Sequence, residues 1–174
     1  MPLFKRNRDL AKKVGAEVFG AMDGTISTLA VIAGVAGAGT GNFIVLVAGA
    51  AAMLAEAISM GFSSYSSSRV RERILGHKKG AGKASAKEGV LFWLVTMGGG
   101  AIPLLPFILP LRLDGISGLW LSVLFSVLFL FAIGFYSGKI TKRSPWKEGI
   151  FNAFVGMVAA AATYVVGYGI SLLA

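Results

Sequence analysis

Five long apolar segments limit what this sequence of 174 residues can fold into. A helix needs about 20 apolar residues to cross a bilayer core of about 30 Å. With 55% hydrophobic residues and a mean hydropathy of +0.74, the sequence predicts an all-α integral membrane protein with five transmembrane helices. We expect residues 1–174 to form one transmembrane domain. The predicted spans are residues 18–38, 43–64, 90–109, 118–136 and 149–173.

Lysine and arginine are distributed unevenly among the segments between the spans. Sixteen of the 17 lie before the first span, between the second and third, or between the fourth and fifth, and Arg112 alone lies on the other side. The positive-inside rule then predicts a cytoplasmic N-terminus and an outside C-terminus. Residues 69–87 are expected to form a basic cytoplasmic loop that contacts anionic lipid head groups of the bilayer. Topology thus explains the net charge of +9 without a nucleic-acid partner.

Several function classes lack the residues that they need. The chain has no cysteine and one histidine, so disulfides, thiolate metal sites and histidine clusters are excluded. No set of nucleophile, base and orienting group is recognisable, and no phosphate-binding loop is present. We therefore expect neither an enzyme nor a bound cofactor.

Glycine and proline mark two local features. The link "GTGN" between the first two spans is short enough to predict an antiparallel hairpin. The third span ends in "GGGAIPLLPFILP", which indicates either a kinked or early-ending helix or a hinge beside a transport pathway. Small residues in the first span favour close helix contacts, including contacts within a dimer. They are Gly20, Gly24, Ala30, Gly34 and Ala38.

Two carboxylates, Asp23 and Glu56, fall inside predicted spans, where a charged side chain costs about 2.5 to 3.5 kcal/mol on insertion scales. No lysine or arginine lies inside a span to neutralise them. Counting from the flanking basic residues puts Asp23 at nearly the same depth as Met60, with Glu56 one turn further outward. Glu56 and Met60 are four residues apart and share a helix face. We expect the three side chains to line one cytoplasm-facing vestibule.

Two carboxylates and a thioether combine hard and soft ligands. Carboxylates alone suit Mg²⁺, Ca²⁺ and Mn²⁺, whereas a methionine sulfur favours softer ions such as Fe(II). A methionine in a span also serves as a packing residue, so both roles are open for Met60. Carboxylates in spans also relay protons, and protonation then competes with cation binding, as a proton-coupled antiporter requires.

Four stretches of the sequence resemble the vacuolar iron transporter family of plants and fungi and its prokaryotic relatives. They are "DGTISTLAVIAGVAGA" from Asp23, "AISMGFSSYSSSR" from Ala57, "GGAIPLLPFIL" from Gly99 and "RSPWKEGIFNAFVGMVAAAATYVVG" from Arg143. The resemblance implies a homodimer of five-span subunits that carries Fe(II), and often Mn(II), out of the cytosol in exchange for protons, with the pathway at the dimer interface. It makes Asp23 and Met60 metal ligands. Such a protein is expected in the cell membrane of a prokaryote or the vacuolar membrane of a eukaryote.

The sequence departs from the family at three places. Family members commonly carry a second-span glutamate where this chain has Ala52, and Glu56 stands one helical turn away on the same face. Position 28, often proline in the family, is a threonine, which is expected to leave the first helix straighter. The plant and fungal proteins also have a glutamate-rich insert between spans two and three. Here that connection is 21 residues with Glu72 and Glu88 as its only acids, too few for such a metal-binding domain.

Two rival functions stay open at this point. A membrane glutamate among small helices also suits a proton-coupled exporter of organic cations, in which Glu56 matters and Met60 does not. A non-transporting membrane subunit or metal-responsive regulator, which moves no ion, is the other. In the first hypothesis, Asp23 and Met60 coordinate the divalent metal ion, and Glu56 is a ligand or a proton relay.

Overall fold

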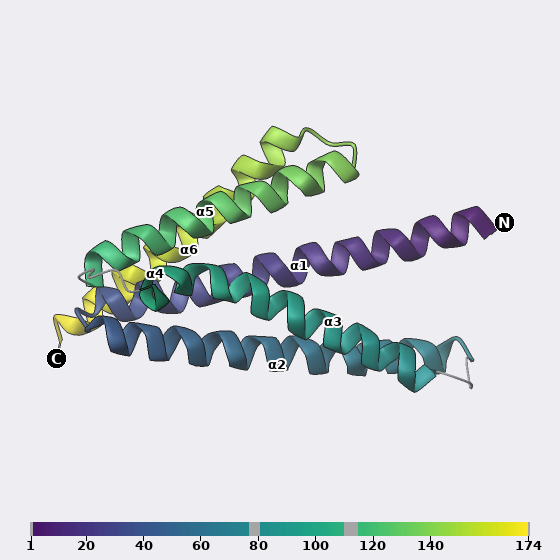
Figure 1. The fold of residues 1–174 in the computed structure, drawn as a ribbon, viewed down its shortest axis with the longest axis horizontal. Coiled ribbons are helices and arrows are strands. Elements are labelled where there is room, and N and C mark those ends of the chain that lie inside the picture. The colour runs from purple at the N-terminus through teal and green to yellow at the C-terminus, as the bar shows by residue number, and fades with distance from the viewer. Residues whose placement is uncertain (1, 77–80, 110–114, 174) are drawn as a thin grey trace.

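The computed structural model describes residues 2–76, 81–109 and 115–173, and throughout these ranges the chain is helical between short links. Five helices are long and apolar enough to cross a membrane, as predicted. The third continues through a short 3₁₀ turn, η1, and a single turn, α4 (Figure 1). The elements are α1 (Pro2–Gly37), α2 (Asn42–Ile74), α3 (Ala81–Ala101), η1 (Ile102–Leu104), α4 (Leu105–Ile108), α5 (Gly115–Ile140) and α6 (Pro145–Ser171).

The basic segment 69–87 is a correction to the predicted loop, because it is helical up to Ile74 and again from Ala81. Hydropathy marks where a helix leaves the apolar layer, and charged residues with good helix propensity let it continue beyond that point. Arg71 and Glu88 form a salt bridge of 2.9 Å between the two helices. The Ser85 hydroxyl donates to Glu72 at 2.8 Å. Three basic residues that were used to predict the topology lie outside the described residues. They are Lys78, Lys79 and Arg112.

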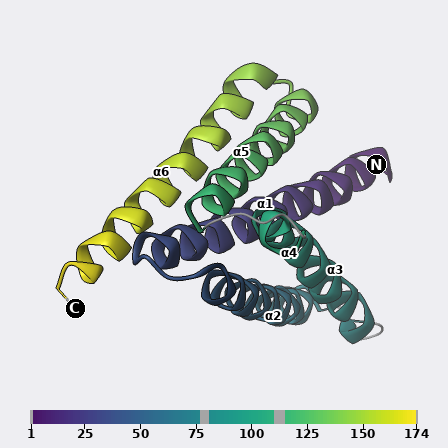
Figure 2. The same cartoon turned by 60° about the vertical axis from the view of Figure 1, so that its left-hand side comes forward.

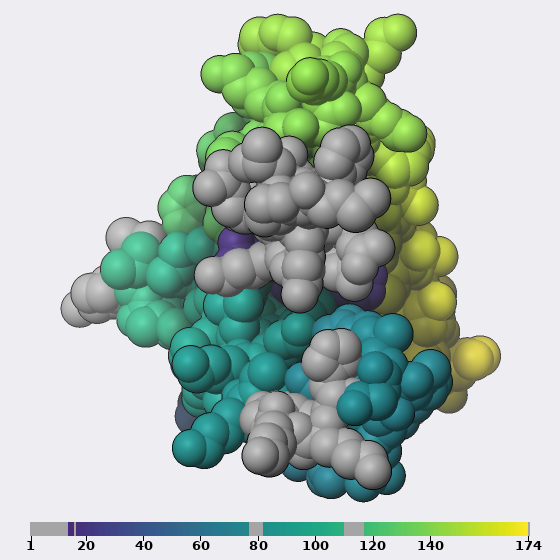
Figure 3. Space-filling model, turned by 90° about the vertical axis from the view of Figure 1, so that its right-hand side faces the viewer, coloured from purple at the N-terminus to yellow at the C-terminus, as the bar shows by residue number. Residues whose placement is uncertain are grey.

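Helix α1 lies at the centre and packs against α2, α3, α5 and α6. The α2–α3 pair and the α5–α6 pair flank it (Figures 1 and 2). Viewed from the N-terminal end, the connected ends of the two pairs lie on opposite sides of the molecule (Figure 3). Both of those connections lie at the same end as the N-terminus, while the C-terminus and the α1–α2 link lie at the other (Figure 1). The basic segments at residues 69–87 and 139–147 are therefore gathered at one end.

The predicted hairpin of the first two spans is present. Helix α1 ends as Gly39 adopts a φ of +74°, a left-handed conformation that suits glycine after a helix C-terminus. The Thr40 hydroxyl donates to the Val35 carbonyl oxygen at 2.8 Å and caps the last turn. Helix α2 then returns antiparallel to α1 (Figure 1). A core forms where α1 meets its neighbours; it consists of Leu29, Ile32, Ala33, Val45, Leu104, Leu119 and Ala160.

The small residues of α1 make close contacts inside the subunit. A Cβ atom on Gly24 would fall on the carbonyl oxygen of Thr96 in α3. Near the other end of α1, Gly34 meets Gly167 of α6 so closely that a Cβ on Gly167 would overlap the Gly34 carbonyl. The predicted close contacts are thus present, and they are made to α3 and α6 of the same subunit.

The glycine- and proline-rich end of α3 is distorted but keeps its backbone hydrogen-bonded. Pro103 has no N–H for the Gly99 carbonyl four residues earlier, and the Thr25 hydroxyl of α1 lies 3.0 Å from that oxygen. Ser122 of α5 donates to the Pro103 carbonyl at 2.6 Å. Neighbouring helices therefore satisfy the freed carbonyls, as a membrane interior demands. This supports the interpretation of a kinked helix.

Two adjacent glycines provide a test of this packing. A Cβ on Gly99 would overlap the Ala21 carbonyl, whereas one on Gly98 meets nothing within 4 Å. We expect Gly99→Ala to lower the free energy of unfolding by about 1–3 kcal/mol, because α1 and α3 must separate. Gly98→Ala, the matched control, should leave it nearly unchanged. Thermal unfolding of both purified variants in detergent measures the difference, and equal midpoints would contradict the proposed α1–α3 contact.

Candidate functional site

The first candidate side chain, Asp23, lies in the part of α1 that is held tightly to α3. Its neighbour Gly24 contacts the backbone of Thr96, which fixes this turn of α1 along and around its axis. Helix α1 runs unbroken through this turn and through Thr28, where the family often has proline. Asp23 itself is half-buried. A carboxyl group is therefore held at a fixed depth in the most central helix.

Glu56 is positioned by the contacts of α2 on either side of it. A Cβ on Gly49 would lie 2.7 Å from Leu104 and 2.9 Å from Ile32, so α2 sits close to the core there. Ala57 is fully buried, which leaves Glu56 at the edge of the packed face, half-buried. The carboxyl groups of Asp23 and Glu56 lie close enough to interact electrostatically. The two predicted carboxylates are thus brought together by α1 and α2.

Met60 is also half-buried and follows Glu56 by one helical turn on the same face. The residue count puts Asp23 level with Met60 and one turn from Glu56, and the structure brings the Asp23 and Glu56 carboxyl groups near one another. The count assumes that helices are parallel and that flanking basic residues mark one plane. Helices α1 and α2 both continue past those residues, so the estimate is good only to about one turn, or 5.4 Å.

No fixed positive charge accompanies this pair in the described part of the chain. The salt bridges found there join Arg71 to Glu88 and Arg143 to Glu148, outside the turns that carry Asp23 and Glu56. Two carboxyl groups in contact repel one another when both are ionised, so a proton or a cation between them is favoured. Within the same residues, no group of three or more histidine, cysteine, aspartate or glutamate side chains gathers. One subunit therefore offers two carboxylates and, one turn away, a thioether.

Sequence reasoning noted Thr28 only for its effect on helix shape and did not note Thr96, and both carry buried hydroxyl groups near the site. Thr28 and Thr96 are fully buried at the contact between α1 and α3, and their hydroxyl oxygens have no hydrogen-bond partner in the structure. A threonine in an apolar span was the only available signal, and it usually indicates a hydroxyl bonded to its own helix. Thr25 behaves that way toward Ala21, at 2.8 Å. Thr28 and Thr96 thus add polar groups beside the turn that carries Asp23.

Comparison with known proteins identifies the chain. The model of the VIT family matches residues 14–80 and 70–168, which is most of the sequence. The chain belongs to the VIT family. Vacuolar iron transporter 1 of Arabidopsis thaliana is 25% identical to it over 207 aligned positions, which cover 84% of this chain and 82% of the relative. The resemblance seen in the sequence is confirmed, and this VIT protein is a transporter, not an enzyme.

The paired carboxyl groups lead to a prediction about stability without metal. Asp23→Asn and Glu56→Gln each remove one of two carboxyl groups that repel when both are ionised, so we expect each to raise, not lower, the free energy of unfolding of the metal-free protein. Glu148→Gln is the matched control, since it removes a carboxylate paired with Arg143 and should lower stability slightly or leave it unchanged. Thermal unfolding with a chelator present measures all three. A loss of stability in both site variants would contradict the proposed repulsion.

Proposed function

We propose that this VIT protein transports Fe(II), with Mn(II) as a second substrate, out of the cytosol. Asp23, Glu56 and Met60 are the residues that bind the ion. The observation that carries the proposal is the contact between the Asp23 and Glu56 carboxyl groups, within the membrane-spanning helices and without a lysine or arginine partner among the described residues. Family membership and the name of the Arabidopsis relative support a metal cargo.

The donor set favours a transition metal. Carboxylate oxygens bind hard divalent ions, and a thioether sulfur adds preference for softer ones. Met60 follows Glu56 by one turn on a shared face, so a single ion within reach of Glu56 is also within reach of the sulfur through side-chain rotation. Mg²⁺ and Ca²⁺ gain nothing from sulfur. The set therefore discriminates against the divalent cations that are most abundant in cells.

Two subunits together supply a more complete site. Three donors are fewer than the four to six that divalent transition metals take, and a homodimer would double them. Asp23, Glu56 and Met60 are all half-buried, and Ser59 and Ser63 on the same side of α2 are exposed. Only 17% of the apolar window of α2 is buried in the subunit, the smallest share among the five candidate spans. A second copy seated on this face would remove the carboxyl groups from lipid.

Proton exchange follows from the same carboxyl groups. A carboxylate pair in a low-dielectric layer is neutralised either by protons or by a divalent cation. Loading one therefore releases the other, which couples metal export to proton entry. With the N-terminus cytoplasmic, as the positive-inside rule predicts, the end that carries the basic segments faces the cytosol. We place the protein in the cell membrane of a prokaryote or the vacuolar membrane of a eukaryote.

The connection between α2 and α3 does not replace the glutamate-rich insert of the plant and fungal proteins. Its two acids are engaged, Glu72 with Ser85 and Glu88 with Arg71. The family model matches the chain in two parts, and the two matched ranges overlap at residues 70–80, within this connection. The alignment with the Arabidopsis relative spans 207 positions, more than the whole of this chain, so it includes stretches of the relative with no counterpart here. We propose that metal enters directly from the cytosol.

Transport by purified protein in proteoliposomes tests the function. With an imposed pH gradient, we expect uptake of Fe(II) and Mn(II), and a rate that falls at least about tenfold in Asp23→Ala, Glu56→Ala and Met60→Ala. Met157→Ala and Glu148→Ala are matched controls, because Met157 is exposed on α6 and Glu148 lies at a helix end. Zn(II), Co(II) and an organic cation complete the substrate set.

The rival functions give different results in the same assay. Organic-cation export that depends on Glu56 but not on Met60 would replace our proposal with the proton-coupled exporter. Absence of any ion movement by well-folded protein would favour the non-transporting subunit. Transport at the wild-type rate by the Asp23 and Met60 variants would show that the site is misassigned.

Cross-linking tests the homodimer. Because the sequence has no native cysteine, any disulfide must come from the introduced residue. We expect Ser63→Cys, on the Glu56 face of α2, to form a disulfide-linked dimer in native membranes under mild oxidation. Ala132→Cys, exposed on α5, should stay monomeric under the same conditions. Gel electrophoresis without reductant separates the two outcomes. Equal cross-linking at both positions would indicate random collision and contradict this interface.

A further inference from the structure

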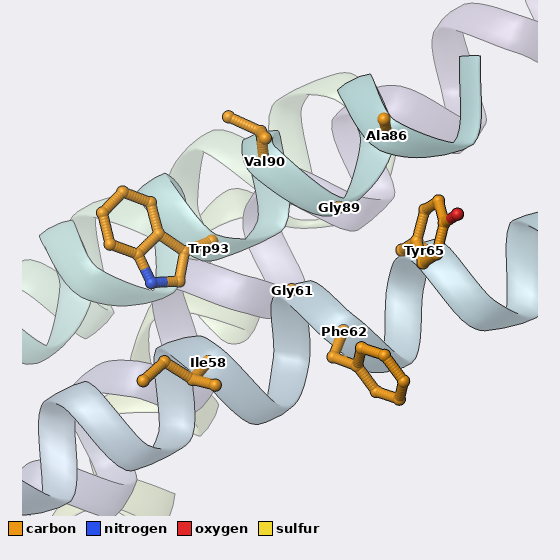
Figure 4. Close-up of a pocket in the computed structure, with 8 residues that line it drawn as sticks. All are labelled: Ile58, Gly61, Phe62, Tyr65, Ala86, Gly89, Val90 and Trp93. Carbon is orange, nitrogen blue, oxygen red and sulfur yellow. The ribbon is translucent and has the colours of Figure 1, made fainter. Parts of the chain in front are cut away.

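An apolar groove lies between α2 and α3 and has a volume of about 350 Å³ (Figure 4). Gly61 and Gly89 face each other where the two helices cross. A Cβ on Gly61 would lie 3.0 Å from the Gly89 carbonyl oxygen, and one on Gly89 would lie 2.8 Å from the Gly61 carbonyl oxygen. Because neither glycine has a side chain, the two helix backbones meet at the floor of the groove. Larger side chains such as Phe62 and Trp93 form its walls.

Both walls continue to a basic residue at the end that carries the basic segments. Arg69 follows the groove residue Tyr65 by four positions, and Lys83 precedes the groove residue Ala86 by three, so each shares a helix face with the wall. The Arg69 guanidinium donates to the Tyr65 hydroxyl at 3.1 Å and lies 5.6 Å from its ring centroid. An apolar channel thus leads to a cationic rim with a phenol hydroxyl.

The charges of this rim are not neutralised within the described residues. The salt bridges there use Arg71 and Arg143. The nearby acids are occupied, because Glu88 binds Arg71 and Glu72 accepts from Ser85. Arg69 and Lys83 are both exposed. The rim therefore presents two cations to an anionic group from outside the chain.

The groove has the depth of one bilayer leaflet and is separate from the metal site. Ile58 and Arg69 are eleven residues apart, or about 16 Å along a helix, close to half of a core of about 30 Å. Ile58 follows Glu56 by two positions, a rotation of about 200°, so the groove is on the opposite face of α2 from Glu56 and Met60.

We infer that this groove binds an anionic phospholipid, with one acyl chain between α2 and α3 and the phosphate at Arg69, Lys83 and the Tyr65 hydroxyl. The apolar walls select a hydrocarbon chain, and the paired cations select a negative head group. A second copy of the chain is a poorer occupant, because a symmetric contact would bring the same cations together. The inference depends on membrane insertion, not on the identity of the transported ion.

Lipid-dependent thermal unfolding of the full-length protein in detergent tests this site. We expect phosphatidylglycerol to raise the unfolding temperature more than phosphatidylcholine with the same chains, and inorganic phosphate to have no effect. In Arg69→Gln/Lys83→Gln the two lipids should act equally, with phosphatidylglycerol affinity about thirtyfold lower. Lys139→Gln/Lys147→Gln is the matched control, because it removes the same charge. Lys139 lies 5.8 Å from the Phe135 ring centroid, a contact similar to that of Arg69 with Tyr65 at 5.6 Å. That control should keep the preference.

A second variant tests the groove itself. Ala86→Phe places a ring where the acyl chain would lie, and native mass spectrometry should then find one phosphatidylglycerol fewer per subunit than in the wild type. An undiminished preference for phosphatidylglycerol in Arg69→Gln/Lys83→Gln would overturn the inference. So would an equal shift with inorganic phosphate, which needs no acyl chain, or efficient cross-linking of Ala86→Cys between two copies in native membranes.

Discussion

The rest of the structure depends on direct backbone contact between α1 and its neighbours. This contact is possible only because glycines meet carbonyl groups there. Gly24 against Thr96 and Gly99 against Ala21 hold α1 to α3, and Gly34 against Gly167 holds it to α6. Hydrophobic burial gives little preference among apolar helices inside a bilayer, so close van der Waals packing must do this. Asp23 is adjacent to Gly24, and its depth and direction are set by that contact.

The same closeness explains how the chain carries proline at the end of α3. Pro103 would leave the Gly99 carbonyl without a donor, and only because α1 lies against this turn can the Thr25 hydroxyl reach it. The Thr25 hydroxyl also lies 2.8 Å from the carbonyl of Ala21, the residue whose backbone Gly99 touches. The close packing of Gly99, the hydroxyl of Thr25 and the missing N–H of Pro103 therefore depend on one another. The distorted end of α3 thus keeps its backbone carbonyls hydrogen-bonded where it packs against α1 and α5.

The sequence predicted the five spans and the α1–α2 hairpin, because length and hydropathy are local properties. The nearness of the Asp23 and Glu56 carboxyl groups agrees with the predicted vestibule, and their role as metal ligands stays a prediction. Sequence reasoning failed at residues 69–87, where helix propensity and the Arg71–Glu88 salt bridge extend helices beyond the apolar layer. Its residue count put Asp23 level with Met60, a prediction of depth only, since such a count carries no information on helix crossing. The groove at Gly61 and Gly89 was out of reach, because its two walls come from different helices and its shape depends on their distance.

Helix α2 is the element that the subunit buries least, and its two exposed faces differ in chemistry. One carries Met60 and Glu56, and the Glu56 carboxylate cannot remain against lipid without a large cost, so that face requires protein, protons or metal. The other is apolar up to Tyr65 and basic at Arg69, which is the profile of a surface that stays in lipid. A phospholipid held between α2 and α3 would cover this apolar face and leave the face of Glu56 and Met60 free for the proposed ion.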